Sequence, residues 1–168
     1  MAGFNRRLYR SLNEFLTDVR ILVSRRKDIR TLVRGDVVAP AFRERLMLTV
    51  TAVNRCRYCS YGHARAALSQ GISGEEIEAL GKGLFEGSPA EEIPAMLYAQ
   101  HWAEMDAEPE PQVREQVAAR YGENVLAMIE LALRMIRVGN LTGNTFDYLL
   151  HRISFGRWGA WGKQIGPP

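Results

Sequence analysis

Apolar residues recur at intervals of three and four along most of the chain, which is the spacing of the buried face of an amphipathic helix. The pattern predicts an all-α fold of six to eight helices. We expect the last helix to be interrupted in a polar segment around residues 139–147. The expected helices cover residues 4–24, 25–35, 41–54, 56–71, 73–83, 88–107, 111–122 and 124–153.

Local signals mark where several of these helices begin. Residues 73–76 and 88–91 have the spacing of a capping box, in which the leading serine accepts a backbone amide of the first turn. Pro40 and Pro111 stand where proline is well tolerated, in the first turn of a helix. We therefore expect a helix to start at each of these four places.

The chain has 168 residues, of which 46% are hydrophobic, so it is large and apolar enough to form a single domain, residues 1–168, with a substantial core. We expect Trp158 and Trp161 to dock on the body or on another subunit, because aromatic side chains favour contact over water. The domain is expected to comprise a basic N-terminal helical extension (1–36), a cysteine-containing redox core (40–71) and a tail rich in glycine and tryptophan (155–168).

The net charge of +3 is unevenly distributed, because the excess of Lys and Arg is concentrated in residues 1–45. A basic segment can contact nucleic acid or an anionic surface. No base-reading motif accompanies it, so we interpret the arginines as the polar face of an amphipathic helix and expect no nucleic-acid partner. No apolar run approaches the ~20 residues of a membrane span and no secretory signal is present, so the sequence predicts a cytoplasmic protein outside the membrane.

Residues 44–63 contain both cysteines of the chain, Cys56 and Cys59, and His63 follows one helical turn later. On a helix, these three side chains fall within roughly 60° of arc. Helical Cα atoms three residues apart are about 5 Å from each other, which suits a disulfide. Two such thiols without an export signal indicate a reducing compartment and a catalytic or metal-binding pair.

Glu44 precedes Cys56 by twelve residues, too far along one continuous helix to reach the thiols. A hairpin near residues 54–56 would instead place Glu44 opposite His63 on the next helix. The carboxylate could then orient or deprotonate an imidazole that faces the thiols, and so favour the nucleophilic thiolate. At the start of that second helix, backbone amides would also favour an anion on Cys56.

The sequence R-E-R-L-x-L at residues 43–48, followed by N-x-C-x-Y-C-x-x-x-H at residues 54–63, resembles the alkylhydroperoxidase D-like group of the carboxymuconolactone decarboxylase superfamily. The resemblance is clear over residues 42–71. It implies an all-α fold and a homo-oligomer, a trimer or a hexamer. The lactone-decarboxylating branch generally lacks the cysteine pair, so the thiols indicate peroxide chemistry rather than decarboxylation.

The resemblance also implies a role for each residue of the motif. Cys59 would meet a hydroperoxide substrate, and Cys56 would resolve the oxidised sulfur into a disulfide. Glu44 and His63 would relay protons. A dithiol on a lipoyl-bearing or thioredoxin-like partner would reset the pair, with no cofactor or metal. The best-studied members carry a second histidine just before the second cysteine, where this chain has Tyr58.

Two other functions fit the same residues. The pair suits thiol–disulfide exchange without a dedicated peroxide substrate. Cys56, Cys59 and His63 can also supply three zinc ligands, with a distant fourth, in a binding module that is not an enzyme. We assign no role to His101 or His151.

The polar segment of the last helix is a further candidate. Gly139 and Gly143 are four residues apart and would let another helix approach closely. Asn140, Asn144 and Asp147 form a polar stripe that faces either the thiol site, a neighbouring subunit or solvent. The sequence leaves these three possibilities open.

Overall fold

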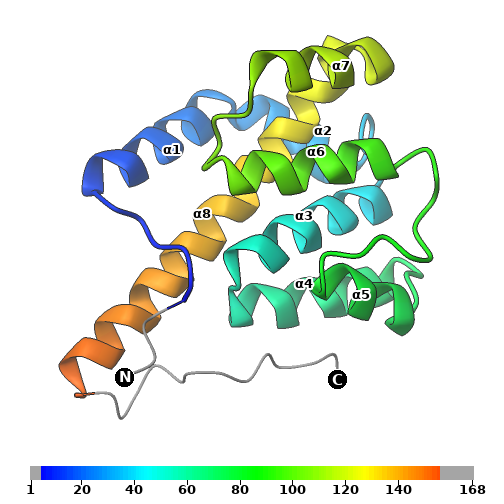
Figure 1. Ribbon diagram of the computed structural model, residues 1–168. Helices are drawn as coiled ribbons and strands as arrows, with labels where there is room; N and C mark the ends of the chain where they lie inside the picture. The colour runs from blue at the N-terminus through cyan, green and yellow to red at the C-terminus, as the bar shows by residue number, and fades with distance from the viewer. Residues whose placement is uncertain (1–4, 156–168) are drawn as a thin grey trace.

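The computed structural model describes residues 5–155, which fold into helices joined by loops, with no strand in that range (Figure 1). The all-α prediction is therefore confirmed. The tail with Trp158 and Trp161 lies outside the described residues. None of the helices in the described range combines the length and apolar character needed to cross a membrane. The helices are α1 (Leu12–Ser24), α2 (Arg26–Arg34), α3 (Pro40–Asn54), α4 (Arg57–Ser69), α5 (Gly74–Gly81), α6 (Ile93–Glu104), α7 (Pro111–Tyr121) and α8 (Glu123–Ile153).

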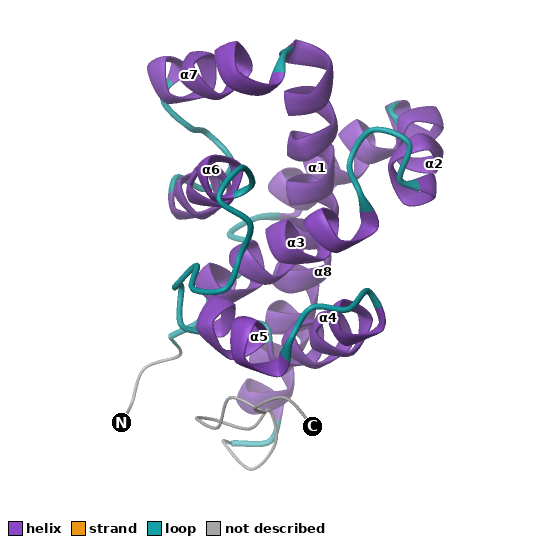
Figure 2. Ribbon diagram, turned by 90° about the vertical axis from the view of Figure 1, so that its right-hand side faces the viewer, coloured by secondary structure: helices purple, strands orange, loops and turns teal. Residues whose placement is uncertain are grey.

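Helix α3 lies at the centre of the fold. It packs against α4, α5, α6 and α8, and Figure 2 shows it enclosed by these elements. Leu46 and Val50 of α3 are completely buried, and each such side chain contributes on the order of 1.5–3 kcal/mol. The core around them is formed mainly by side chains of α6 and α8: Ala95, Met96, Tyr98, Ala99, Trp102, Leu126, Ile129, Leu131, Leu133 and Ile136.

Helices α3 and α4 form the predicted antiparallel hairpin. Arg55 adopts a left-handed conformation (φ 58°), and its amide donates to the carbonyl of Thr51 at 2.7 Å, which ends α3. Cys56 follows as the N-cap residue of α4. The turn is therefore only two residues long, and it brings the C-terminal end of α3 directly beside the first turn of α4 (Figure 1).

The first helix begins later than predicted. α1 starts at Leu12, because the hydroxyl of Ser11 caps it by accepting the amide of Glu14 at 3.2 Å. Residues 5–10 are not helical. They run along α8 instead, where the amide of Tyr9 donates to Oγ1 of Thr145 at 3.3 Å. These tertiary contacts outweigh the helical periodicity of the segment.

One of the two predicted capping boxes is confirmed and the other is wrong. The hydroxyl of Ser73 accepts the amide of Glu76 at 3.1 Å and starts α5. Ser88 does not start a helix, and α6 begins only at Ile93. The hydroxyl of Ser88 donates instead to the carboxylate of Glu76 at 2.7 Å. That carboxylate is also the partner of Arg45, so Ser88 belongs to a buried ion-pair cluster and not to a helix cap.

The predicted break in the last helix is absent. α8 continues without interruption from Glu123 to Ile153. The side chains of Asn140, Asn144 and Asp147 are at most 1% exposed. The helix stays intact because these polar groups bond to other segments of the fold and do not compete for its own backbone.

Candidate thiol site

The two cysteines lie together at the N-terminus of α4. Cys56 is the N-cap residue, and Cys59 follows in the first turn. Both are free thiols, and their Sγ atoms are 2.7 Å apart. The backbone amide of Cys59 donates to Sγ of Cys56 at 3.4 Å. Cys56 is buried (1% exposed), whereas Cys59 is partly accessible. The expected position of the pair at a helix start is therefore observed.

This arrangement favours one negative charge on the pair. A hydrogen bond from the Cys59 thiol lowers the pKa of Cys56 to about 7, and backbone amides of Cys59 and Tyr58 and the charge of Arg6 act in the same direction. The same interaction with Cys56 raises the pKa of the Cys59 thiol. The opposite directions of the two pKa shifts favour a state in which the sulfurs share a single proton.

Glu44 and His63 are in direct contact, as the hairpin prediction requires. Oε2 of Glu44 is 2.7 Å from Nδ1 of His63, and the Glu44 side chain is buried. Arg43 adds a positive charge 3.5 Å from the other carboxylate oxygen. With Nδ1 held by the carboxylate, Nε2 is the ring nitrogen left to exchange a proton. His63 is one turn after Cys59 on the same helix, so the imidazole and this thiol share a face.

Helix α8 forms the wall behind the sulfurs. A Cβ atom added to Gly143 would lie 3.2 Å from Sγ of Cys56, and one added to Gly139 would lie 3.9 Å from Sγ of Cys59. The close approach predicted for these two glycines is thus made to the thiol pair. Since any side chain at residue 143 would meet the Cys56 sulfur, glycine allows α8 to pack there.

A buried amide network links α8 to α3 beside this wall. Asn140 donates to Oγ1 of Thr51 at 3.1 Å and accepts from Nδ2 of Asn54 at 3.1 Å. Asn144 donates to the carbonyl of Asn54 at 2.7 Å. The Asn140 side chain also acts as a hydrogen-bond donor to Cys59 and lowers the pKa of that thiol against the larger effect of Cys56. The polar stripe of α8 therefore faces the thiol site.

Thr51 and Asn54 are the partners of this stripe, and the sequence did not predict that pairing. The available signal was their spacing, because the two polar residues are three apart in the last turns of α3 and therefore share a face. Their burial identifies them as part of the site.

Tyr58 stands beside the thiols but its hydroxyl serves another group. It donates to Oδ1 of Asp147 at 2.8 Å, and Arg57 donates to the same oxygen at 3.0 Å. Arg6 donates to Oδ2 of Asp147 at 2.6 Å. Asp147 is completely buried, so its charge is balanced by these neighbours. Asp147 is a second feature whose partners the sequence did not reveal.

Residues 25–105 match the model of the carboxymuconolactone decarboxylase family. The matched segment is similar to that family. The resemblance expected from the sequence is thereby confirmed for the superfamily. The match contains the whole α3–α4 hairpin, with Glu44, both cysteines and His63. Searches of curated proteins and of solved structures found no match.

Two components of the site come from outside the family segment. Helix α8 supplies the glycine wall, Asn140 and Asp147, and the N-terminal segment supplies Arg6. The family hairpin thus brings the reactive groups, while flanking parts of the chain surround them.

In the part of the chain that is described, the structure supports neither a role of His101 at the thiol site nor a metal site. His101 is bound to Glu110, the residue that precedes α7, away from the hairpin. Within residues 5–155, no group of three or more His, Cys, Asp or Glu side chains is arranged to hold a metal ion. Cys56, Cys59 and His63 are therefore not arranged as the three ligands that the zinc interpretation needs.

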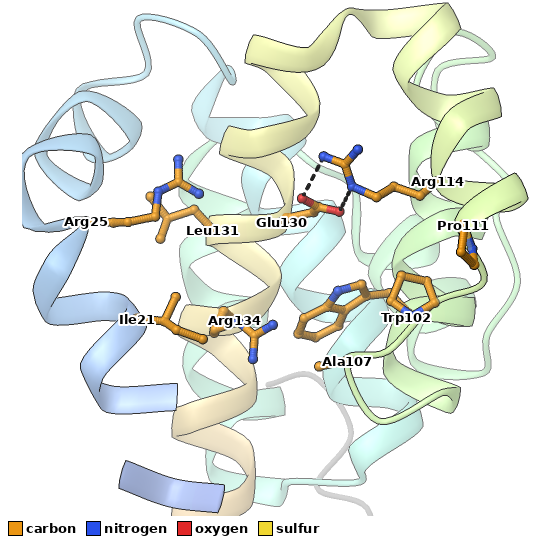
Figure 3. A pocket seen from close by; sticks show the side chains of 10 residues that line it. Ile21, Arg25, Trp102, Ala107, Pro111, Arg114, Glu130, Leu131 and Arg134 are labelled. Carbon is orange, nitrogen blue, oxygen red and sulfur yellow. Dashed lines mark hydrogen bonds and ion pairs between the residues drawn. The ribbon is translucent and has the colours of Figure 1, made fainter. Parts of the chain in front are cut away.

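A cavity of about 370 Å³ opens between α1, α6, α7 and α8, but none of the four candidate residues lines it (Figure 3). Its arginines are engaged in the fold. Arg114 binds Glu130, Arg134 binds Asp18 beside Trp102, and Arg25 donates to the carbonyl of Ala127. We do not assign this cavity to the thiol chemistry. The cavity is lined by Ile21, Arg25, Trp102, Ala107, Pro109, Pro111, Arg114, Glu130, Leu131 and Arg134.

Proposed function

We propose that this chain is a thiol-dependent hydroperoxide reductase in which Cys56 and Cys59 form a reversible disulfide. The observation that supports it most is the 2.7 Å separation of two reduced sulfurs at a helix N-terminus. His63, bound to Glu44 at 2.7 Å, stands on the same helix face. A pair so placed closes into a disulfide with little movement, and the adjacent imidazole can carry the proton.

In the first proposed step, the thiolate of Cys59 attacks the terminal oxygen of the hydroperoxide. An S–O bond forms as the O–O bond breaks, and Cys59 becomes a sulfenic acid while the remainder leaves as an alkoxide. His63, whose positive charge Glu44 stabilises, holds the proton that the Cys56–Cys59 pair has already lost. This proton then passes to the alkoxide and releases an alcohol.

In the second step, Cys56 attacks the sulfenic sulfur. The S–O bond breaks, the leaving hydroxide takes up the proton that remains on the Cys56 thiol and departs as water, and the Cys56–Cys59 disulfide forms. An external dithiol then gives two electrons and two protons to the pair and becomes a disulfide itself. A lipoyl-bearing or thioredoxin-like protein has the required chemistry. Because the pair must be reduced again after each turnover, we expect the protein to act in a reducing compartment, the cytoplasm.

Charge and exposure favour different sulfurs in the resting pair. The hydrogen bond from the Cys59 thiol, together with the amides at the start of α4, lowers the pKa of Cys56 and favours the negative charge there, whereas Cys59 is the accessible sulfur. Transfer of the shared proton across 2.7 Å exchanges these two states. We therefore retain Cys59 as the sulfur that meets the peroxide and Cys56 as the one that resolves it.

A second candidate function is disulfide exchange without peroxide. It is favoured by the pKa of Cys56, which at about 7 is close to the value of the thioredoxin nucleophile. In addition, Tyr58 stands where the resembling peroxidases have a second histidine, and its hydroxyl is bound to Asp147. An exchange enzyme would reduce protein disulfides and leave hydroperoxide unchanged.

The two candidates are separated by measuring both activities on one preparation. We expect reduction of an organic hydroperoxide at the expense of a dithiol to be much faster than reduction of insulin disulfides. The Cys59→Ser variant should lose the peroxide activity, and Ser69→Ala, on the exposed end of α4, should retain it. Rapid insulin reduction together with no peroxide consumption would replace the first candidate with the second.

We also propose that the chain forms a homo-oligomer, a trimer or a hexamer. Leu12, Leu16 and Val23 are exposed on α1, and Leu149 and Ile153 are exposed on α8. Apolar side chains grouped on one helix commonly mark a protein contact. Light scattering coupled to size exclusion should give a mass of several times 19.0 kDa, and a monomeric mass at micromolar concentration contradicts the proposal.

A further inference from the structure

The buried carboxylate of Asp147 gathers two guanidinium groups from distant parts of the chain. Arg6 reaches it from the N-terminal segment at 2.6 Å, and Arg57 reaches it from α4 at 3.0 Å. Asp147 is completely buried, and the side chains of Arg6 and Arg57 are only 14% and 20% exposed. The three groups together carry one excess positive charge in a poorly hydrated place.

This excess charge is connected to the thiol pair through the side chain of Tyr58. A Cβ atom at Gly143 would meet Sγ of Cys56 at 3.2 Å and Cδ2 of Tyr58 at 3.6 Å, so the sulfur and the tyrosine ring lie against the same glycine. The hydroxyl of that tyrosine is bound to Asp147. In addition, Nε of Arg57 is buried without a hydrogen-bond partner, so one donor of the cluster is left unsatisfied.

The N-terminal segment is held in place by several bonds that do not involve Arg6. The amide of Tyr9 donates to Oγ1 of Thr145, and the carbonyl of Arg7 accepts from the side chain of Asn144 at 2.9 Å. Arg55 donates to the carbonyl of Asn5 at 3.4 Å. The segment therefore keeps its course along α8 when the Arg6 side chain is changed, which makes the charge testable by itself.

We propose that Asp147 is a positioning residue that holds Arg6 beside Cys56, and that the charge of Arg6 stabilises the anionic form of the Cys56–Cys59 pair. The inference rests on the thiol chemistry of the proposed function and adds a group from outside the family segment. It gives the basic N-terminal segment a role at the site. It also supplies a positive charge on the side of the pair where this chain has Tyr58 instead of a histidine.

The other groups around Cys56 have partners of their own, as Arg6 has in Asp147. Cys59 shares its proton with Cys56, and Tyr58 and Arg57 are bound to Asp147. The Glu44–His63 pair is internally balanced when the imidazole is protonated. The positive charge of Arg6 acts to lower the pKa of Cys56.

The experiment follows the ultraviolet absorbance of the thiolate against pH on the fully reduced protein, without peroxide. The variants are Arg6→Gln, Arg6→Lys and, as a control that removes the same charge from the same segment, Arg10→Gln. Arg10 is 75% exposed and is paired with Asp106. Circular dichroism confirms that each variant keeps its helices.

We expect the first thiol midpoint of Arg6→Gln to rise by about half a pH unit or more, because a nearby opposite charge favours the anion. The midpoints of Arg6→Lys and Arg10→Gln should stay close to that of the unchanged protein. An unchanged midpoint in Arg6→Gln, an equal rise in Arg10→Gln, or a failure of lysine to restore the value would each overturn the inference. Since no peroxide is used, failure of the proposed function would appear separately, as absent turnover in a protein with a normal thiol midpoint.

Discussion

Gly143 lies against the sulfur of Cys56, so that a Cβ atom at this position would stand 3.2 Å from Sγ. A contact of that length is tighter than ordinary van der Waals packing. Gly139, one turn earlier on α8, would place its Cβ 3.9 Å from the sulfur of Cys59, which is an ordinary distance. The two glycines face the same thiol pair, but an added side chain would have less space at residue 143 than at residue 139. Alanine substitutions at the two positions therefore test whether α8 confines the sulfurs.

Gly143→Ala should reduce the free energy of unfolding by about 1 kcal/mol or more, because the added methyl group overpacks a filled site. It should also slow disulfide closure, because Cys56 must move. Gly139→Ala should instead be neutral or stabilising by up to about 1 kcal/mol, through the helix preference of alanine. Urea denaturation of the reduced proteins checks both values. Equal effects of the two substitutions would show that α8 does not confine the pair as described.

Glu44→Gln should lower the rate of peroxide consumption by about 100-fold or more while the helices are retained, because the imidazole loses the charge that stabilises its protonated form. Glutamine keeps the shape of the side chain, so the effect reports the charge. Glu110→Gln is the control, because Glu110 is bound to His101 on the surface, outside the thiol site. Single-turnover rates with an organic hydroperoxide give the comparison. Equal rates for the two variants would remove Glu44 from the mechanism.

Asn140→Ala should lower the free energy of unfolding by about 2 kcal/mol or more, because it leaves buried groups of Thr51 and Asn54 without their partner. Asn124→Ala, at an exposed position of the same helix, should change it by less than about 0.5 kcal/mol. Thermal and urea unfolding check the pair of variants.

Asn140→Asp tests whether the side chain at position 140 influences the ionisation of the thiols. The new carboxylate should raise the midpoint of thiol ionisation, because it replaces a donor to the Cys59 sulfur with a negative group. Slower alkylation at neutral pH would be the observed result. Unchanged alkylation would show that the residue at position 140 does not act on the sulfurs.

Cys59→Ala should raise the pKa of Cys56 above about 7, because the hydrogen bond from the Cys59 thiol is the largest cause of its lowering. In the reciprocal variant Cys56→Ala, the pKa of the Cys59 thiol should fall, because Cys56 is the main cause of its elevation. Alkylation by iodoacetamide as a function of pH measures each remaining thiol. If the Cys56 midpoint is the same with and without Cys59, the two sulfurs do not share a proton.

Sequence signals that act within one turn of helix predicted the fold well. The caps at Ser73 and the prolines at positions 40 and 111 depend only on their neighbours, and the structure confirms them. Ser88 has the same local pattern, but its hydroxyl is used by the carboxylate of Glu76, twelve residues away. Residues 5–10 have helical periodicity, yet their partners are on α8. Such long-range competition is not visible in a local pattern.

In the candidate site, too, the contacts between neighbouring helices could be predicted and the long-range contacts could not. The contact between Glu44 and His63 could be predicted, because a short hairpin fixes which residues face each other. The groups supplied by α8 could not be matched to their partners. Asn140 reaches Thr51 across 89 residues of chain, and Asp147 meets Arg6 across 141. A single sequence does not show which distant residues pair with each other. The small and polar residues of α8 indicated only that another part of the structure packs against this helix.

The central claim is that one hydroperoxide molecule oxidises Cys56 and Cys59 together, beginning at Cys59. Counting free thiols after one equivalent of an organic hydroperoxide, with a sulfenic-acid trap present, tests it most directly. The account predicts loss of two thiols per peroxide in the unchanged protein, a trapped sulfenic acid on Cys59 in Cys56→Ser, and no reaction in Cys59→Ser. Retention of both thiols in the unchanged protein, or a sulfenic acid that forms on Cys56 when Cys59 is absent, would contradict it.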